Sequence, residues 1–452
     1  MTDPLALAES ALDAVGPADG ALVRVVAERS LFLRFAASRP TQSTSLDDLT
    51  VEVVAVRDGH VGVAATNGAG RDAVETAARS ARVAAEAAAR DGAPGSYPGP
   101  PESGEVRGPR GHDPATARLD SDAGAAAMTA AFEACDARGV EAHGVWTAGE
   151  VRTAVASSSG AALLDEVTDA FMKVTAIVPG GRSGYASAAG VAASEIDARG
   201  VAQRAVEKAT AGGEPRRLEP GEYPVVLEPA AVGQLLQHLG DLAFNGLSYS
   251  EGRSALSDRL GQLVAAPRIN IADSPRHPRT LPRAFDAEGV AKAPLPLIQD
   301  GVAHRVVHDA RSAALAGARS TGHALAPGGG AGGPLPTNLV LTGGAARSTE
   351  ELCRPIERGV YVTRLWYTNP VRPKETLLTG LTRDGTFLIE NGAIAGPLED
   401  MRMTERILAI LERTEDLTAE PELWSEGEFY GRRFATGVVC PALRASAVRF
   451  TA

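Results

Sequence analysis

The chain has 452 residues, of which 44% are hydrophobic and 22% are charged. That length exceeds one ordinary hydrophobic core, and the balance is typical of a soluble globular protein with two domains. The formal charge of -11 argues against nucleic acids and anionic membranes as partners, because both select a basic protein surface.

Three cysteines, Cys135, Cys353 and Cys440, lie far apart in the sequence and never form a C-x-x-C pair. This spacing supports neither a disulfide framework nor a thiolate zinc site, and it favours reduced thiols. The N-terminus lacks the basic start and apolar core of a secretory leader, and no apolar run reaches the roughly 18 residues of a membrane span. We therefore expect a cytoplasmic protein.

The first part of the chain predicts a group of short strands followed by a helix. Strands are expected at residues 22–27, 31–35, 51–57 and 61–65. Asp58-Gly59 stands between the last two of them and is a strong hairpin signal. An Ala-rich helix should follow over 72–90, because its residues are good helix formers, and should end at Asp91-Gly92.

A similar group follows further along the chain. Ser121 is expected to cap a helix, and Ser194 a second helix over 195–210. Between these helices we expect strands at residues 141–147, 151–157, 169–178 and 183–188. The segment Gly59-His-Val-Gly-Val-Ala-Ala before one helix resembles Gly181-Arg-Ser-Gly-Tyr-Ala-Ser before another, which indicates either an internal repeat or a chance similarity of two hairpin-helix units.

Two stretches rich in proline and glycine divide the chain. Residues 93–116 contain Pro, Gly and Ser at a density that prevents regular structure, which indicates a linker or a surface excursion. The turn-rich stretch 212–221 is the best domain boundary. We therefore expect one domain over 1–215 and a second domain over 216–452.

The second domain is organised around a helix expected over 228–246. Pro229 suits the first helical position, and Gly246 suits a left-handed residue just past the end. The apolar residues that recur at helical spacing are Val232, Leu235, Leu236, Leu239 and Leu242. The polar residues on the other side are Gln237, His238 and Asp241.

Downstream of this helix the sequence predicts mostly strands. They are expected at residues 268–272, 295–308, 338–342, 359–367, 386–390 and 393–397. Asp300-Gly301 and Asn391-Gly392 mark hairpin turns within this set, and a last helix is expected over 405–412. The fold class is thus α+β, with an antiparallel sheet and helices in the first domain. The second domain should be mostly antiparallel, sheet-like or barrel-like, with few helices.

Several short motifs follow one another in an order known from one protein family. They are Gly252-Arg-Ser254 with Leu260-Gly261, Asp273-Ser-Pro275, Phe285-Asp-Ala-Glu-Gly289, Leu297-Ile-Gln-Asp-Gly301, Thr337-Asn-Leu-Val-Leu341 and Phe387-Leu-Ile-Glu-Asn-Gly392. Each motif is individually weak. Because they occur in a shared order, the chain resembles the TldD/PmbA family over nearly its whole length.

The resemblance implies what the central helix does in relatives. A TldD-like subunit carries His-Glu-x-x-x-His there, with two histidines and a later cysteine as zinc ligands and the glutamate as base. Zinc lowers the pKa of its bound water toward neutrality. In this chain Gln237 replaces the first histidine, His238 the glutamate and Leu242 the second histidine, with Asp241 beside them. Tyr430-Gly431 stands where the family has its cysteine.

The chain therefore resembles the TldE/PmbA-type subunit, which lacks the zinc motif. Such a subunit would pair with a TldD-like subunit that carries His-Glu-x-x-x-His and the zinc, giving a heterodimeric metallopeptidase for small or unfolded peptides. No catalytic residue, metal or other cofactor is expected in this chain. A homodimer is possible when it is alone.

Two other hypotheses stay open. The chain could be a self-sufficient metallopeptidase with substitute ligands, for which His238, His304, His308 and Cys440 are the candidates. It could instead be a regulatory or binding protein, since the family is associated with modulation of DNA gyrase. The negative charge disfavours direct DNA contact, so such a role would act by protein contact.

Two further pairs of residues have both a structural and a functional interpretation. Asp286 and Glu288 could bind a substrate amine, but their position near a turn favours a solvated loop. Trp366 and Tyr367 lie in a predicted strand, where an aromatic pair indicates core or interface rather than a stacking platform.

Overall fold

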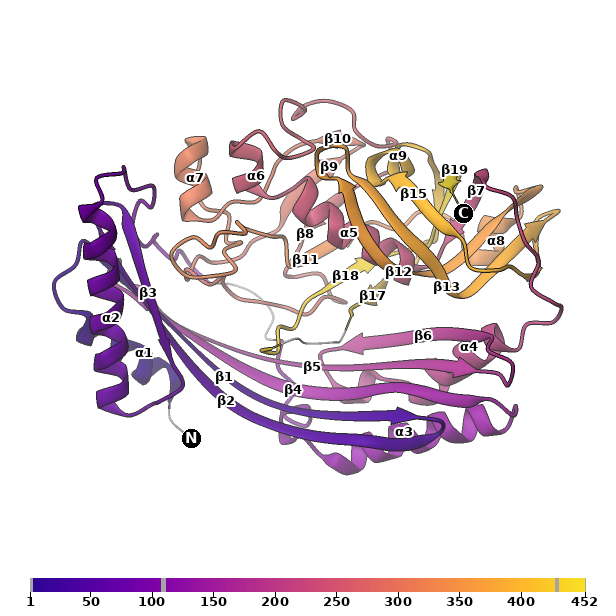
Figure 1. The fold of residues 1–452 in the computed structure, drawn as a ribbon, viewed down its shortest axis with the longest axis horizontal. Coiled ribbons are helices and arrows are strands. Elements are labelled where there is room, and N and C mark those ends of the chain that lie inside the picture. The colour runs from indigo at the N-terminus through magenta and orange to yellow at the C-terminus, as the bar shows by residue number, and fades with distance from the viewer. Residues whose placement is uncertain (1–2, 107–110, 427–430, 452) are drawn as a thin grey trace.

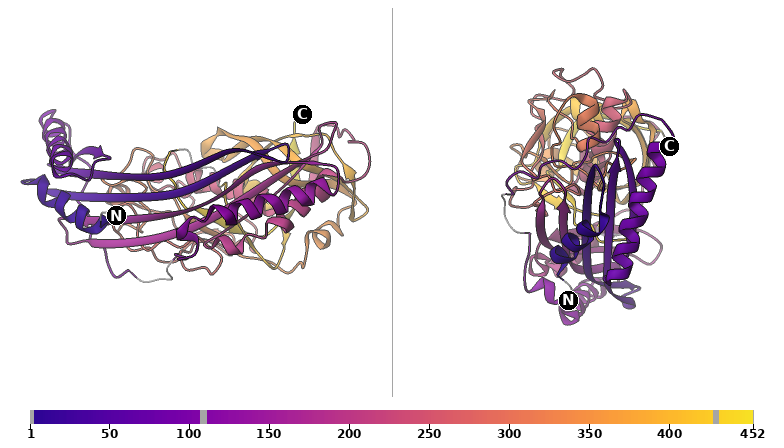
Figure 2. Two further views of the ribbon diagram at one scale, coloured as in Figure 1. Left: turned by 90° about the horizontal axis from the view of Figure 1, so that it is seen from below. Right: turned by 90° about the vertical axis from the view of Figure 1, so that its left-hand side faces the viewer.

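The computed structural model describes residues 3–106, 111–426 and 431–451. Figure 1 shows two layers: a long, curved sheet from the N-terminal part below, and the C-terminal part on its concave side. Seen from below in Figure 2, helix α3 lies in front of the strands, on the side of the sheet that faces away from the C-terminal part. The sheet is thus covered on both faces.

The N-terminal sheet has the strand order β3-β2-β1-β4-β5-β6, and its neighbouring strands are antiparallel. The strands are β1 (Gly20–Ala36), β2 (Arg39–Arg57), β3 (His60–Thr66), β4 (Glu141–Ser157), β5 (Ala162–Ile177) and β6 (Ser183–Gly190). The helices that cover one face are α1 (Pro4–Val15), α2 (Arg71–Arg90), α3 (Ser121–Asp136) and α4 (Ala198–Ala209). No helix in the described ranges combines the length and apolar character that crossing a membrane requires.

Side chains alternate between the two faces of this sheet, as the pleat of a strand dictates. On β1, Val23 and Val25 pack in the cluster with α1 and α2, while Leu22 and Val26 pack against the C-terminal part. Arg24 shares the second face and lines a cavity there. The sheet therefore offers an apolar face to its helices and a mixed face to the C-terminal part.

Two of the predicted breaks between strands are wrong, because β1 and β4 are single long strands. The polar residues 28–30, expected to join two short strands, lie in the middle of β1. Glu28 and Ser30 are buried, and the Ser30 hydroxyl donates to Glu28 Oε1 at 2.6 Å. The backbone N–H of Arg433, from the C-terminal part, donates to Glu28 Oε2 at 2.7 Å. These polar groups are partners for a distant segment rather than turn formers.

The sheet has the symmetry of an internal repeat, since β1, β2 and β3 with α2 correspond to β4, β5 and β6 with α4. Gly62 of β3 and Gly184 of β6 occupy matching positions in the two similar sequence segments. A Cβ on Gly62 would lie 2.0 Å from the carbonyl oxygen of Ala81, and one on Gly184 would lie 2.1 Å from that of Ala205. Each glycine thus lets a helix approach its third strand closely.

Replacing Gly62 or Gly184 by alanine should push α2 or α4 away from the sheet. We expect the free energy of unfolding to fall by about 1–3 kcal/mol, the usual cost of overpacking. Gly212 is the control, because an added Cβ there meets nothing within 4 Å. Gly212→Ala should change stability by less than about 0.5 kcal/mol in denaturant titrations. Three equal stabilities would contradict the close approach of helix and strand.

Two helices begin at aspartates rather than at the predicted serines. The Asp120 carboxylate caps α3 and the Asp197 carboxylate caps α4, each accepting a backbone N–H at 2.9 Å. Both residue types are good caps, so propensity alone does not choose between neighbours. Helix α1, capped by Asp3 and begun by Pro4, has no counterpart in the prediction.

Residues 93–106 form no helix or strand, as predicted, but they are anchored to both layers. Tyr97 is 4% exposed and its backbone N–H donates to the Gly59 carbonyl at 3.0 Å. Further on, the Ser103 carbonyl accepts the backbone N–H of Ala291 at 2.8 Å. This stretch therefore connects the N-terminal sheet to the C-terminal part through backbone hydrogen bonds.

The C-terminal part contains two sheets, with the strand orders β10-β9-β8-β11-β18-β17 and β12-β7-β19-β15-β13-β14. In the second sheet β12 also pairs with β13, so β12, β7, β19, β15 and β13 close into a ring, and β16 pairs with β19. The strands are β7 (Gly221–Leu227), β8 (Ile271–Asp273), β9 (Leu295–Gln299), β10 (Val302–Ala303), β11 (Asn338–Leu341), β12 (Arg358–Arg372), β13 (Leu377–Glu390), β14 (Ala393–Pro397), β15 (Arg402–Arg406), β16 (Thr414–Leu417), β17 (Glu422–Trp424), β18 (Gly437–Cys440) and β19 (Leu443–Phe450). The helices are α5 (Pro229–Leu242), α6 (Gly246–Ser250), α7 (Ala310–Ala316), α8 (Thr349–Cys353) and α9 (Ile407–Glu412). The α+β class, with a barrel-like closure, is confirmed.

The end of the central helix differs from the prediction. Pro229 is its first residue, as expected, but α5 ends at Leu242. Gly246 is not left-handed and instead opens α6, which Asn245 caps through its side chain. The expected return strand to His308 is also too long, because β10 ends at Ala303.

Three predicted hairpin turns are confirmed by their backbone angles. Asp58, Asp300 and Asn391 have φ values of 49°, 49° and 51°, and the glycine after each is also at positive φ. Two consecutive residues at positive φ form the turn whose twist matches antiparallel strands. The unpredicted elements α7, α8, β15, β16 and β17 have seven residues or fewer, too few to show a periodic pattern.

Candidate functional site

Four residues of helix α5 lie at or beside the positions of the family's zinc motif, and their surroundings differ. Gln237 is exposed, and Asp241 is exposed and accepts a bond from Asn245 Nδ2 at 3.3 Å. His238 is half-buried, with Nε2 2.8 Å from Thr368 Oγ1 on β12, and burial lowers its pKa despite the nearby Asp241. Leu242 is 7% exposed and belongs to the main hydrophobic core. The side chains at these positions do not converge on one point.

A cavity of about 330 Å³ lies beside this helix, and we call it the α5 cavity. Gln237 and Gly240 border it from α5, and Pro336, Trp424 and Val438 from other segments. Trp424 lies on the helix because Gly233 leaves room, since a Cβ there would come within 2.6 Å of the indole ring. Among the described residues that line the α5 cavity, none is a histidine or a cysteine.

The candidate substitute ligands do not form a metal site either. His304 is exposed after β10, whereas His308 is buried with Nδ1 3.2 Å from Ser312 Oγ. Cys440 is buried in β18, where its thiol donates to the Pro229 carbonyl at 3.3 Å and burial raises its pKa. Within residues 3–106, 111–426 and 431–451, no three His, Cys, Asp or Glu side chains are grouped to hold a metal. The candidate ligands among the described residues therefore do not form a set that fits zinc.

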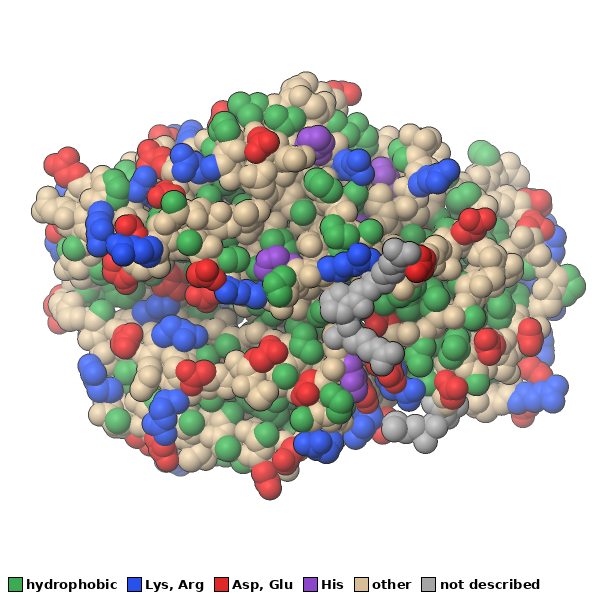
Figure 3. Space-filling view, turned by 180° about the vertical axis from the view of Figure 1, so that it is seen from behind, with side chains coloured by type: hydrophobic (Ala, Val, Ile, Leu, Met, Phe, Trp, Pro, Cys, Tyr) green, Lys and Arg blue, Asp and Glu red, His purple; other side chains and the backbone are tan. Residues whose placement is uncertain are grey.

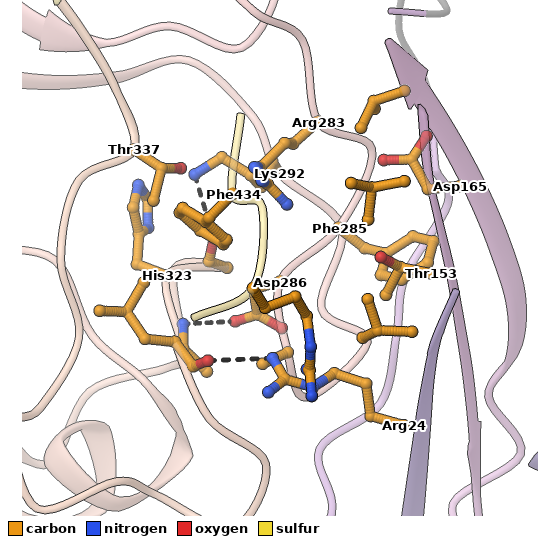
Figure 4. A pocket seen from close by; sticks show the side chains of 18 of the residues that line it. Arg24, Thr153, Asp165, Arg283, Phe285, Asp286, Lys292, His323, Thr337 and Phe434 are labelled. Atoms are coloured by element: carbon orange, nitrogen blue, oxygen red, sulfur yellow. Dashed lines mark hydrogen bonds between the residues drawn. The ribbon is translucent and has the colours of Figure 1, made fainter. Parts of the chain in front are cut away.

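A second cavity of about 290 Å³ lies between the N-terminal sheet and the C-terminal part, and we call it the interlayer cavity. In Figure 4, Arg24 and Asp165 reach it from the sheet, while Arg283, Lys292 and His323 reach it from loops of the C-terminal part. The two cavities are neighbours, because Leu325, Thr337, Arg432 and Phe434 border both.

A buried ion cluster supports the interlayer cavity. Asp273 is fully buried, with Lys292 Nζ at 3.1 Å and His323 Nε2 at 3.2 Å. Burial alone would raise the pKa of Asp273, but Lys292 and His323 hold it well below its ordinary value. Asp273 also accepts the backbone N–H of Asn338 at 2.8 Å. The cluster joins the end of β8 to the segments that carry Lys292 and His323.

The prediction of a solvated loop at Asp286 and Glu288 is wrong, since both side chains are buried. Asp286 accepts backbone N–H groups from Glu288, Val290 and Ala324, each at 2.9 Å. Burial raises the pKa of Asp286 to about 6, and burial together with Asp286 raises that of Glu288 to about 8. The pair braces the loops instead of facing solvent.

Sequence reasoning missed Arg283, Lys292, His323 and Arg433, although it singled out the neighbouring segments. Asp273-Ser-Pro275 and Phe285-Asp-Ala-Glu-Gly289, for example, prove to be walls or supports of the interlayer cavity. Single basic residues with no regular spacing give no pattern that a sequence argument can use. Their nearness to these short motifs was the one signal present.

Comparisons with known proteins give the family. Residues 220–452 match the PmbA/TldA metallopeptidase C-terminal domain, and residues 115–212 match the PmbA/TldA metallopeptidase central domain. A curated relative, a metalloprotease of Methanothermobacter thermautotrophicus, is 24% identical over 200 residues, which are 44% of this chain and 43% of that protein. The chain thus matches less than half the length of this relative.

Solved structures share the fold over almost the whole chain. TldE from Thermococcus kodakarensis has a TM-score of 0.86 at 19% identity and 99% coverage of both chains. A candidate modulator of a DNA gyrase from Thermotoga maritima has a TM-score of 0.83 at 20% identity, with 96% of both chains covered. A similar protein from Bacteroides thetaiotaomicron has a TM-score of 0.79 at 18% identity, covering 99% of this chain and 98% of the other. These likenesses show a shared fold, and the two domain matches show that the chain belongs to the PmbA/TldD family.

Proposed function

We propose that this chain is the non-catalytic, TldE/PmbA-type subunit of a heterodimeric zinc metallopeptidase that acts on small or unfolded peptides. The observation that carries the proposal is the burial of Leu242 in the hydrophobic core, where the zinc helix of a catalytic subunit has its second ligand. An alkyl side chain cannot coordinate a metal, and the Gln237 amide is a poor substitute for a histidine. Helix α5 would shape a substrate cavity without cleaving peptides.

An exposed apolar edge supports the proposed pairing. Trp366, Tyr367 and Val371 on β12 are 40%, 74% and 51% exposed. They lie next to Thr368, which joins β12 to His238 of α5. Contiguous apolar side chains on a surface are typical of contacts between proteins. We assign this edge to the TldD-like subunit that carries His-Glu-x-x-x-His and the zinc.

The test is co-expression of this chain with such a relative, followed by purification through a tag on this chain. We expect a one-to-one complex that holds zinc and cleaves unstructured peptides. The chain purified alone, as a monomer or a homodimer, should hold no stoichiometric zinc and show no cleavage. His238→Ala in this chain should leave the activity of the complex within about twofold, because His238 Nε2 is bonded to Thr368 and the described residues hold no group of three potential metal ligands.

Other outcomes would replace the proposal. Stoichiometric zinc and cleavage by the chain alone, lost on His238→Ala, would make it a self-sufficient metallopeptidase. Failure to form the complex would point to a regulatory protein that acts by other protein contacts. Figure 3 shows acidic and basic side chains interspersed over one face of the molecule, unlike the basic stripe of a nucleic-acid-binding protein. The proposed location is the cytoplasm, which suits three unpaired, buried cysteines.

A further inference from the structure

The charged side chains that line the interlayer cavity are nearly all compensated. Arg24 Nε lies 2.6 Å from Glu52, and Arg432 lies 3.8 Å from the same carboxylate. Lys292 and His323 share Asp273, Arg433 binds Asp169, and Asp286 is held by backbone N–H groups. Besides Asp286, two lining charges, Arg283 and Asp165, form no ion pair within the described residues.

Arg283 is held in place by neutral groups. Its Nε and Nη2 donate to the Ala435 carbonyl at 3.2 and 3.0 Å, and its guanidinium carbon stacks 3.8 Å from the centre of the Phe434 ring. Burial lowers its pKa to about 10, so it is still a cation at neutral pH. A planar guanidinium with a free edge is suited to binding a carboxylate through two parallel hydrogen bonds.

Asp165 stands on β5, on the other wall of the cavity (Figure 4). Its Oδ2 accepts the backbone N–H of Ala284 at 2.9 Å. Burial raises the pKa of Asp165, and the nearby Arg283 opposes that rise. The two charges are thus close enough to influence each other, yet too far apart to pair. A ligand with both charges would bridge them.

The other walls of the cavity indicate which side chain the ligand carries. Val26, Val151, Val167 and Phe285 line the same cavity and offer apolar surface to an aliphatic side chain. The volume of about 290 Å³ suits a small ligand. We propose that the interlayer cavity binds a free α-amino acid or a dipeptide, with its carboxylate on Arg283 and its ammonium group near Asp165.

This inference goes beyond the proposed function, because such binding needs neither zinc nor a partner subunit. It is tested by isothermal titration calorimetry on the full chain alone. L-Leucine and alanyl-leucine should bind saturably. The tighter binder of the two shows whether the natural ligand is a free amino acid or a dipeptide. Leucinamide lacks the carboxylate and N-acetyl-leucine lacks the ammonium group. Each should bind about tenfold or more weakly than leucine.

Variants locate the site. Arg283→Gln and Asp165→Asn should each weaken leucine binding by about tenfold or more. Arg279→Gln, a change at an exposed arginine near the same loop, should leave binding unchanged. Thermal unfolding shows whether each variant is folded. If one is not, the four-ligand comparison on the unaltered chain still decides.

Three results would overturn the inference. They are absence of leucine and alanyl-leucine binding at millimolar concentration, equal binding of leucine and leucinamide, and equally tight, competitive binding of inorganic phosphate, which would indicate a general anion site. A chain that binds leucine but forms no metallopeptidase complex would support this inference and reject the proposed function. A chain that forms the metallopeptidase complex but does not bind leucine would reject this inference and support the proposed function.

Discussion

Arg433→Met should lower the free energy of unfolding by about 3–5 kcal/mol, the usual cost of leaving a buried charge without its partner. Arg433 is 1% exposed, and its Nε and Nη2 bind the two oxygens of Asp169 at 2.6 and 2.8 Å. Asp169 is itself 3% exposed, so water cannot replace the guanidinium there. Nη1 also donates to Thr147 Oγ1 at 2.9 Å. Methionine fills much of the space but supplies none of these donors.

Urea denaturation of single and double variants measures this effect. Asp169→Asn in the Arg433→Met background removes the stranded charge, so the double variant should recover part of the loss. The control is Arg432→Met at the adjacent arginine, whose side chain is 28% exposed and lies 3.8 Å from Glu52. It should cost less than about 1 kcal/mol, as exposed ion pairs do. A similar cost for Arg432→Met and Arg433→Met would reject the anchoring role.

The Arg433 contacts also explain where sequence-based prediction of the fold fails. The polar residues that split β1 in the prediction, Glu28 and Ser30, accept from the Arg433 backbone and guanidinium. Gly149 splits β4 in the same way, and a Cβ there would lie 2.4 Å from the Arg433 side chain. A polar or glycine break is locally the signature of a turn. Here the pairing with neighbouring strands continues through the break, and a segment hundreds of residues away supplies the partners of its polar groups.

Local signals, in contrast, predict local structure well. Asp-Gly and Asn-Gly turns need only two residues at positive φ, which the sequence itself supplies. The similar segments around Gly62 and Gly184 leave a repeat and a chance similarity equally open, and in the structure both glycines allow the same close approach of a helix. Accordingly the α+β class, the hairpins and the central helix could be predicted, while strand lengths and exact helix caps could not.

The candidate site divides in the same way. The positions Gln237, His238 and Leu242 could be named from the resemblance of one helix to its family, whereas the interlayer cavity is assembled from β1, β4, β5 and several loops. Asp273 and His323 are fifty residues apart, and only the tertiary fold brings them to 3.2 Å. The sequence predicts solvent exposure for Asp286 and Glu288, because charged residues are mostly exposed. Buried, they become the source of a pH effect.

As pH rises from about 5 to 9, the parent should lose more stability than Glu288→Gln, because only the parent carries the buried carboxyl at residue 288. The pKa of Glu288 rises from 4.5 to about 8 in the folded chain, because the side chain is buried beside Asp286 and Asp309. A carboxyl whose pKa is raised by folding stabilises the native state fully below its unfolded pKa. That contribution disappears as pH passes the folded pKa. At about 1.4 kcal/mol per pH unit, the loss for Glu288 is at most about 5 kcal/mol.

Glutamine suits the site of the protonated acid. Glu288 Oε2 accepts the backbone N–H of Ala310 at 2.8 Å, a bond that an amide oxygen can also accept. The amide NH₂ can donate toward the Tyr97 hydroxyl, whose pKa is raised by burial and by Glu288. Thermal and urea unfolding of both proteins at pH 5, 7 and 9 give the comparison. The variant should be the more stable of the two at pH 9.

Two further measurements make the Glu288 effect specific. Glu375→Gln changes a half-exposed carboxylate on the surface, 3.4 Å from Arg372, and should keep the pH dependence of the parent. Asp286 is still ionisable in Glu288→Gln, and its pKa of about 6 should leave a smaller slope between pH 4 and 6. If Glu288→Gln and the parent lose equal stability between pH 7 and 9, the proton on Glu288 is not what the fold requires. If the stability of Glu288→Gln no longer depends on pH between 7 and 9 but still does between 4 and 6, the buried carboxyl of Glu288 beside Tyr97 is the source of the effect at high pH.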